Sequence, residues 1–441
     1  MTAALAPILD SLIPATGSGK AIMAAILLGA GCGLIGCFVV LRRVALMGDT
    51  LSHAVLPGVV AGLIYSPERS LTVIFSCAIA AGMLGAGLVR ALMASTRLKS
   101  DAALGVVLAT FFALGIMWQT RNQQATAGVM NFLFGNVGSI DASDLRAMLV
   151  STAVLAVTVL LLSRPLLLVS FDEGFSRGLG YPVRLLNAVF YFLLTFSVVV
   201  ALQAVGIVLV SAMLITPAAA AYLLTDRFGK MLIFSVTLGV LSGVTGGVVS
   251  ARVDNLPTGP VITLAATLVF IVAYLAAPRH GVMARLFRTA RNRKRVRREN
   301  MLKAIYLIFE TEGFAHEEVS LLMLARKRGL TEDLVRKECN ILHRHDLIEM
   351  SEDGLSLHLS RAGWKRAIEM VRNHRLWELY LTNEADYAED HVHDDAEKIE
   401  HILDPGIVRQ LERELDFPEL DPHGKPIPHP SHLVSPSHVV N

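Results

Sequence analysis

Long apolar stretches, separated by short polar turns, fill roughly the first two thirds of the chain. A helix of about 20 mostly apolar residues is long enough to cross a bilayer. The pattern predicts nine spans, of which the second and the seventh are short: 21–41, 53–66, 71–89, 102–118, 147–163, 187–209, 211–224, 231–250 and 260–277. If the short segments merge with a neighbour or re-enter, the count becomes eight. Short or broken helices often border a transport path.

The pattern changes after residue 278, where charged residues replace the apolar runs. Residues 279–298 form a basic run that predicts a juxtamembrane linker, with nucleic-acid binding as the alternative. Residues 299–365 alternate helical periodicity with turns and end in a hairpin pattern with an Asp-Gly turn, which predicts a winged-helix domain. Residues 366–430 predict a helical domain rich in acidic residues and histidine, and residues 431–441 a disordered tail.

The placement of Lys and Arg predicts the orientation of the membrane domain. With nine spans, most basic loop residues fall on the same side as the C-terminal basic run, and the N-terminus lies outside. The net charge of +2 hides this asymmetry because it averages two unlike halves. We therefore expect an all-α polytopic domain, residues 1–278, in the cell (inner) membrane and a cytoplasmic C-terminal half.

A carboxylate and an imidazole stand four residues apart at the start of the second span: Asp49 and His53. Residues at this spacing share one face of a helix. A charged group at the centre of a membrane helix costs about 2.5–3.5 kcal/mol on insertion scales, so it needs a partner, a cavity or a transported ion. Oxygen and imidazole ligands together suit Mn, Zn or Fe(II). The pair is predicted to bind a transported metal transiently, with a purely structural role as the alternative.

The residues around this pair, Gly-Asp-Thr-Leu-Ser-His-Ala-Val-Leu-Pro-Gly at 48–58, resemble the signature of permease subunits of manganese/zinc/iron ABC importers. The resemblance covers about residues 20–280. It implies a type II importer-like fold, a separate ABC ATPase subunit, an extracytoplasmic metal-binding protein and a second permease subunit. The polar loop at 171–182 looks like the helix that docks such permeases into their ATPase, with an ordinary charged loop as the alternative. Its candidate coupling residues are Glu173, Gly174, Arg177 and Gly180.

No catalytic residue is expected in this chain. The segment 16–20 looks like part of a phosphate-binding loop, but that motif requires Gly at 14 and Ser or Thr at 21, where Pro14 and Ala21 stand. The chain is therefore predicted to be a transport subunit rather than an enzyme, with a passive metal channel as an alternative. Three polar residues of the segment 203–220, which also resembles the permease family, either line the pathway or bond to their own backbone: Gln203, Ser211 and Thr216.

Three residues of the C-terminal half could share a metal ion, because Glu397, Glu400 and His401 fall on one helical face. Residues 366–430 resemble the metal-binding and dimerisation domain of diphtheria-toxin-repressor-type metalloregulators, and the resemblance to these regulators as a whole runs over about residues 299–430. The Glu at 397 resembles the manganese-responsive branch, so manganese is the first candidate ion, with zinc and iron as alternatives. The resemblance implies a regulatory ligand set and an ancillary pair: His374, Glu397, Glu400 and His401, and Glu378 and His393.

The first helix of this half departs from the manganese branch. Asn300 and Lys303 stand where that branch carries Asp and Glu ligands. An amide oxygen binds a metal weakly, and a charged lysine cannot bind one. We therefore expect a metal site that is incomplete, weaker or partly replaced by salt bridges from Lys303, with a solvated acidic helix as the alternative.

Together these features predict the permease of an ATP-driven Mn, Zn or Fe importer whose cytoplasmic domain senses metal and regulates transport. The alternative is a permease fused to a metal-dependent repressor that binds DNA, either tethered or after proteolytic release. The third winged-helix helix offers Arg336 and Lys337 as possible DNA contacts, but its acidic residues weaken its basic character. The residues leave the identity of the transported metal open.

Overall fold

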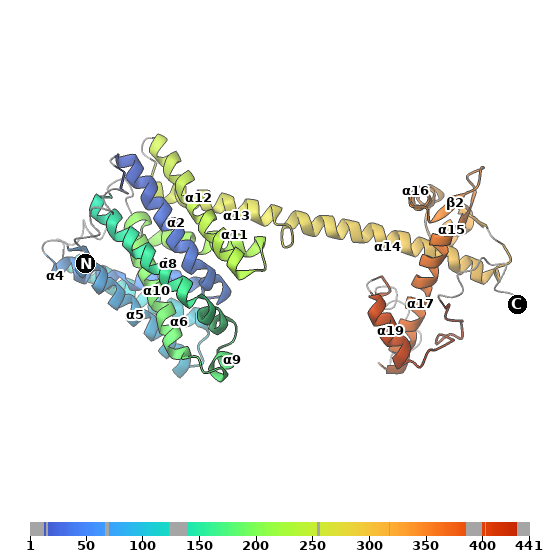
Figure 1. The fold of residues 1–441 in the computed structure, drawn as a ribbon, viewed down its shortest axis with the longest axis horizontal. Helices are drawn as coiled ribbons and strands as arrows, with labels where there is room; N and C mark the ends of the chain where they lie inside the picture. Colours follow the sequence, from blue (N-terminus) through green and yellow to red (C-terminus); the bar gives the residue numbers. More distant parts are fainter. Residues whose placement is uncertain are drawn as a thin grey trace. The chain divides into compact units, whose positions relative to one another are not determined.

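The structure is a computed structural model, and it describes residues 13–429 except 15, 67–69, 123–139, 254–255, 317, 385–398 and 402. The chain divides into two compact units, Met1–Arg285 and Leu286–Asn441 (Figure 1). The first is a bundle of helices, and the second combines helices with one small sheet. The tail predicted for residues 431–441 lies outside the described residues.

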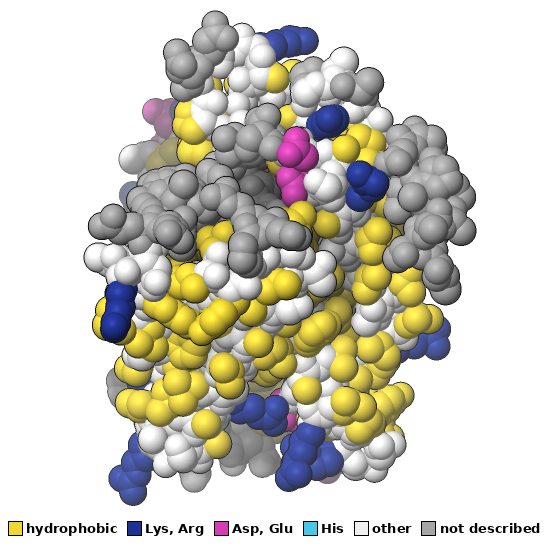
Figure 2. Space-filling view, turned by 90° about the vertical axis from the view of Figure 1, so that its left-hand side faces the viewer, with side chains coloured by type: hydrophobic (Ala, Val, Ile, Leu, Met, Phe, Trp, Pro, Cys, Tyr) yellow, Lys and Arg dark blue, Asp and Glu magenta, His cyan; other side chains and the backbone are white. Residues whose placement is uncertain are grey.

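The N-terminal unit is built from apolar helices. Within the described residues, eight helical stretches are long and apolar enough to cross a membrane, and Leu209–Leu224 is a shorter apolar helix. Figure 2 shows apolar side chains over the middle of one face of this unit, with Lys and Arg side chains near its ends. The helices are α2 (Gly17–Leu41), α3 (Ala45–Ala54), α4 (Leu56–Tyr65), α5 (Leu71–Ser95), α6 (Ser100–Arg121), α8 (Ala142–Phe171), α9 (Glu173–Gly178), α10 (Val183–Val205), α11 (Ile207–Leu224), α12 (Phe228–Arg252) and α13 (Thr258–Ala276).

The second span is a broken helix made of α3 and α4, and together they cover Ala45–Tyr65. The sequence-based start at residue 53 was therefore too late. Thr50 and Ser52 donate hydrogen bonds to carbonyl oxygens one turn earlier, at 3.0 and 2.8 Å, so these polar residues fit inside a buried helix. The break lies at Val55, two residues before Pro57, which has no backbone N–H to continue the helical ladder.

Close backbone approach holds the bundle together at glycines. A Cβ atom added to Gly29 of α2 would lie 2.3 Å from the carbonyl oxygen of Gly239 in α12. Without side chains at this crossing the two helices approach each other directly, as small residues allow in membrane helices. This tight crossing holds α2 against α12, and α2 is the helix that precedes α3 in the chain.

The C-terminal unit contains a winged-helix arrangement. Strands β1 and β2 both pair antiparallel with β3, and Ile348 of β2 lies opposite Leu359 of β3. The hairpin turn contains Gly354 at a φ of 66°. Val319 and Ser320 form a short strand, and Ser320 also caps the next helix by accepting a hydrogen bond from Met323 N. The elements are α14 (Val282–Thr311), β1 (Val319–Ser320), α15 (Leu321–Arg328), α16 (Glu332–His343), β2 (Ile348–Met350), β3 (Ser356–Leu359), α17 (Arg361–Glu384) and α19 (Pro405–Glu414).

Candidate metal centres

Asp49 and His53 lie one turn apart on α3, as their spacing predicted. His53 Nε2 is 3.9 Å from Asp49 Oδ1, and the two side chains are 20% and 39% exposed. Within the part of the chain that is described, His53 Nδ1 is buried without a hydrogen-bond partner. The imidazole meets the ring of Phe112 on α6 edge-on, with ring centroids 5.0 Å apart. The pair therefore presents a carboxylate and an imidazole on one helical face.

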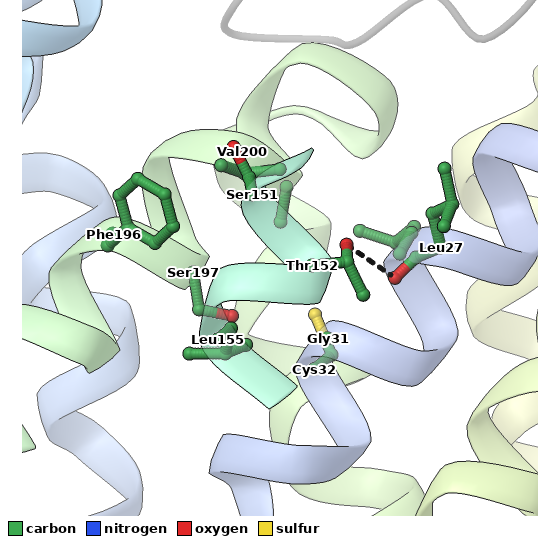
Figure 3. Close-up of a pocket in the computed structure, with 11 residues that line it drawn as sticks. Leu27, Gly31, Cys32, Ser151, Thr152, Leu155, Phe196, Ser197 and Val200 are labelled. Carbon is green, nitrogen blue, oxygen red and sulfur yellow. Dashed lines mark hydrogen bonds between the residues drawn. The ribbon is translucent and has the colours of Figure 1, made fainter. Parts of the chain in front are cut away.

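A small pocket lies between α2, α8 and α10, and its lining does not include Asp49 or His53 (Figure 3). Its lining includes Cys32, Ser151 and Ser197, and Thr152 Oγ1 lies 3.5 Å from the carbonyl oxygen of Leu27. Among the residues that the structure describes, no Asp, Glu or His lines this pocket. We do not assign a metal to it, because it lacks the charged or imidazole ligands that a divalent ion needs.

The candidate coupling segment forms a short helix, α9. Asp172 caps it by accepting a hydrogen bond from Phe175 N at 2.9 Å, and Gly180 closes it at a φ of 83°. Phe175 and Leu179 are 58% and 56% exposed. Glu173 lies 3.8 Å from Arg177, and Glu173 Oε1 accepts a hydrogen bond from Asn187 of α10 at 2.9 Å. The helix thus presents apolar side chains outward and is joined to the bundle by a carboxylate.

Arg42 extends this connection to the end of α2. Its side chain donates to Asn187 Oδ1 at 2.7 Å and to Ser170 Oγ of α8 at 2.9 Å. The guanidinium carbon lies 4.1 Å from the centre of the Phe190 ring. Asn187 therefore bridges Arg42 and Glu173. The sequence does not predict this arrangement, because Arg42 has the pattern of an ordinary loop cation and Asn187 stands alone in an apolar run.

The other pathway candidates are less informative. Ser211 and Thr216 are half-buried on α11. The side chain of Gln203 lies outside the part of the chain that the structure describes. It therefore stays a prediction that Gln203, Ser211 and Thr216 either line the transport pathway or bond to their own backbone.

In the C-terminal unit, a buried ion network surrounds Lys303 of α14. Lys303 Nζ donates to Glu400 Oε2 at 2.7 Å and lies 2.9 Å from His374 Nδ1. His374 Nδ1 lies 2.5 Å from the same oxygen of Glu400, and His374 Nε2 lies 2.9 Å from Glu378 Oε1. The salt bridge that the lysine at 303 predicted is thus present, and both ring nitrogens of His374 lie against charged partners.

These contacts shift two pKa values in opposite directions. Burial disfavours charge on His374, but hydrogen bonds to Glu378 and Glu400 outweigh it and raise the pKa of His374. Burial also disfavours a charged Glu400, yet the hydrogen bond from His374 and the charge of Lys303 lower the pKa of Glu400. Both shifts favour the charged forms, as expected for a paired network.

His401 lies on the other side of Glu400. Its Nδ1 is 2.8 Å from Glu299 Oε2, and its Nε2 is 3.5 Å from Glu400 Oε1. Among the described residues, His401 Nε2 and Glu400 Oε1 are buried without hydrogen-bond partners. Both residues line a pocket within this unit that also includes Arg295 and Asp404. A carboxylate that holds one ring nitrogen leaves the other free to act as a ligand.

The predicted regulatory ligands are therefore divided. His374 faces Lys303 and Glu378, whereas His401 faces the opposite oxygen of Glu400. Glu397 and His393 lie outside the described residues. Within residues that are described, no group of three or more His, Cys, Asp or Glu side chains could hold a metal. The side of Glu400 that carries Lys303 does not fit a metal. On the side that carries His401, two potential ligand atoms have no hydrogen-bond partner among the described residues.

The possible DNA contacts Arg336 and Lys337 are exposed on α16. Glu332 and Asp333 in the first turn of the same helix are exposed as well. Mixed charges of this kind give a weak attraction for phosphates. DNA contact through this helix stays a prediction.

Comparison with known proteins finds a matching protein family for each half of the chain. The ABC 3 transport family profile matches residues 18–277, and the profile for the iron dependent repressor, metal binding and dimerisation domain matches residues 360–429. The chain is 35% identical over 367 residues to the manganese transport system membrane protein MntC of Bacillus subtilis, covering 82% of this chain and 83% of that protein. It is 35% identical over 274 residues to the zinc transport system membrane protein TroC of Treponema pallidum, covering 61% of this chain and 92% of that protein.

A solved structure, PsaBC from Streptococcus pneumoniae in complex with Fab, aligns with a TM-score of 0.56 at 33% identity, over 63% of this chain and 97% of that chain. The similarity to the Bacillus subtilis protein is longer than the ABC 3 match and so continues beyond the membrane domain. The predicted helical polytopic fold and the predicted fusion of a permease with a metalloregulator-type domain are both confirmed. The chain belongs to the ABC 3 transport family and carries a metal-dependent repressor-type domain after its membrane helices.

Proposed function

We propose that the membrane domain imports a divalent transition metal, Mn, Zn or Fe(II), and that Asp49 and His53 bind it in transit. The observation that best supports this is the buried Nδ1 of His53, which has no hydrogen-bond partner among the described residues and lies beside a carboxylate on a broken span. One chain supplies only two ligands, fewer than the three or four that protein sites commonly give to such a metal. A second permease subunit related by two-fold symmetry would supply the same two residues and complete the coordination.

The energy would come from a separate ABC ATPase that docks on α9. Phe175 and Leu179 offer an apolar contact surface there, and the bond between Glu173 and Asn187 ties this surface to the bundle. An extracytoplasmic metal-binding protein would deliver the ion to the opposite face. The C-terminal unit would lie in the cytoplasm, because the loops on its side of the membrane carry most of the Lys and Arg.

This function is tested by metal uptake into membrane vesicles that contain the chain and its partner ATPase. We expect ATP-dependent accumulation of at least one of Mn, Zn and Fe(II), with the other ions competing for the same pathway. Accumulation that is equally fast without ATP would contradict the importer and favour a passive channel.

We also propose that the C-terminal domain regulates transport and binds the same class of ion, with manganese as the first candidate. The supporting atoms are Glu400 Oε1 and His401 Nε2, which are unpartnered among the described residues, while Glu299 orients His401. Glu397 would add a ligand from the same helical face, and Glu378 and His393 would form the ancillary pair. When bound, the ion would supply a positive charge that draws these side chains together.

Replacing His401 by asparagine is expected to weaken inhibition of uptake by cytosolic Mn at least about tenfold, because it removes the ring nitrogen that would bind the ion and the contact with Glu299 that orients the ring. The measurement is the rate of uptake at increasing Mn inside inverted or preloaded vesicles. His343→Asn, on α16, is the matched control and should leave inhibition unchanged. Equal inhibition of the parent and the His401 variant would contradict metal regulation through this residue.

A further inference from the structure

Lys303 is an ammonium group at a place where the surrounding side chains have the chemistry of metal ligands. Its side chain is only 9% exposed, and its partner carboxylate on Glu400 is fully buried. Lys303 comes from α14, His374 from α17 and Glu400 from the segment 399–401. One nitrogen therefore connects three segments that are far apart in the sequence.

The ammonium and a metal ion cannot share this position. Lys303 Nζ lies 2.7 Å from Glu400 Oε2 and 2.9 Å from His374 Nδ1, so it takes up the two atoms that would face an ion there. The remaining ring nitrogen of His374 is 2.9 Å from Glu378 Oε1. A dication beside the buried ammonium would also be repelled strongly, because charges interact with little screening inside a protein.

The ammonium can still do the structural work of an ion. It carries a positive charge and three N–H donors, it donates to the Glu400 carboxylate, and it lies beside the His374 ring. Removing one partner from a buried, hydrogen-bonded charge network is strongly destabilising, because it leaves the other charges uncompensated. The network therefore depends on Lys303 as a metal site depends on its ion.

We propose that Lys303 is a built-in cation that replaces a metal on the His374 side of Glu400. It holds α14, α17 and the segment 399–401 together at every metal concentration. Any ion that Glu400 binds is then confined to the His401 side of this carboxylate. The proposal is carried by the contacts of Lys303 and is independent of whether the His401 side binds metal.

The first test counts bound Mn on the full chain in detergent micelles, using electron paramagnetic resonance of free Mn. The parent carries Asp49→Ala and His53→Ala, so that the membrane ligands do not contribute. Adding Asn300→Asp and Lys303→Glu should create one further Mn site per chain. This gain supports the Lys303 proposal whether the parent binds one ion or none. A parent that binds none would contradict a different proposal, the regulatory metal site at His401. A parent that loses one Mn on His374→Ala would overturn the Lys303 proposal.

The second test needs no metal and covers the case in which the double variant does not fold. Lys303→Met keeps the length of the side chain and removes its charge. In metal-free buffer we expect limited proteolysis of the C-terminal unit to become at least about tenfold faster than in the parent, because local opening exposes the cleavage sites. The matched control is Lys294→Met, the same change at an exposed position of α14. Equal proteolysis rates for Lys303→Met and Lys294→Met would overturn the proposal.

Discussion

Replacing Asp49 and His53 together by alanine should abolish ATP-driven metal uptake, with a loss of at least about 100-fold. Removing a residue that only supports a metal ligand typically costs 10–100-fold in affinity or activity, and this change removes two proposed ligands themselves. The helix should survive, because alanine favours helix and His53 Nδ1 has no hydrogen-bond partner to lose among the described residues. The measurement is initial uptake of Mn, Zn and Fe(II) by vesicles with the partner ATPase, normalised to the amount of chain in the membrane.

Thr50→Ala with Ser52→Ala is the matched control on the same helix. Both hydroxyl groups donate to carbonyl oxygens of their own helix, so their loss should leave uptake within about a factor of three. If the Asp49/His53 variant reaches the membrane in normal amounts and imports metal at the rate of the parent, these residues are not the transport ligands.

Local spacing explains why sequence alone identified this pair. Asp49 and His53 belong to one helix, and a helix fixes the relative position of residues four apart. The length of the apolar stretch did not predict the boundary of the span, because it placed the polar residues before His53 outside the membrane. Their hydroxyl groups are satisfied within the helix, and this is visible only in the structure.

Contacts between distant segments could not be predicted in the same way. Arg42 and Asn187 are 145 residues apart, and neither belongs to a recognisable motif. For Lys303 the sequence indicated a salt bridge. It could not show that Glu400 points one oxygen at Lys303 and the other towards His401. This division depends on how three separate segments pack, so local sequence patterns do not predict it. It decides on which side of Glu400 a metal ion could bind.

The link from Glu173 through Asn187 to Arg42 has a physical consequence for transport. Arg42 ends α2, and Arg43 follows at a φ of 57° just before α3, the helix that carries Asp49 and His53. If a separate ATPase docks on α9 as proposed, a displacement of α9 would pull on hydrogen bonds that end close to the start of α3. Hydrogen bonds to charged groups are worth about 1.5–3 kcal/mol each, so losing them would weaken the connection between α9 and the end of α2.

Arg42→Met should therefore separate ATP hydrolysis from transport. The variant keeps an apolar stem over the Phe190 ring but loses the bonds to Ser170 and Asn187. We expect uptake to fall at least about tenfold while the assembled ATPase still hydrolyses ATP, because α9 is no longer tied to the end of α2. The measurement is the number of metal ions imported per ATP hydrolysed in proteoliposomes.

Arg43→Met makes the same chemical change one residue later, at an exposed side chain, and should leave the ratio of metal to ATP near that of the parent. Asn187→Leu should reproduce the effect of Arg42→Met, because it breaks the bridge between Arg42 and Glu173 at its centre. If both variants import as many ions per ATP as the parent, the network only stabilises the bundle and α9 acts on α3 by another route. If Arg42→Met and Asn187→Leu fail together while Arg43→Met does not, the loss follows the hydrogen bonds rather than the removal of positive charge from this loop.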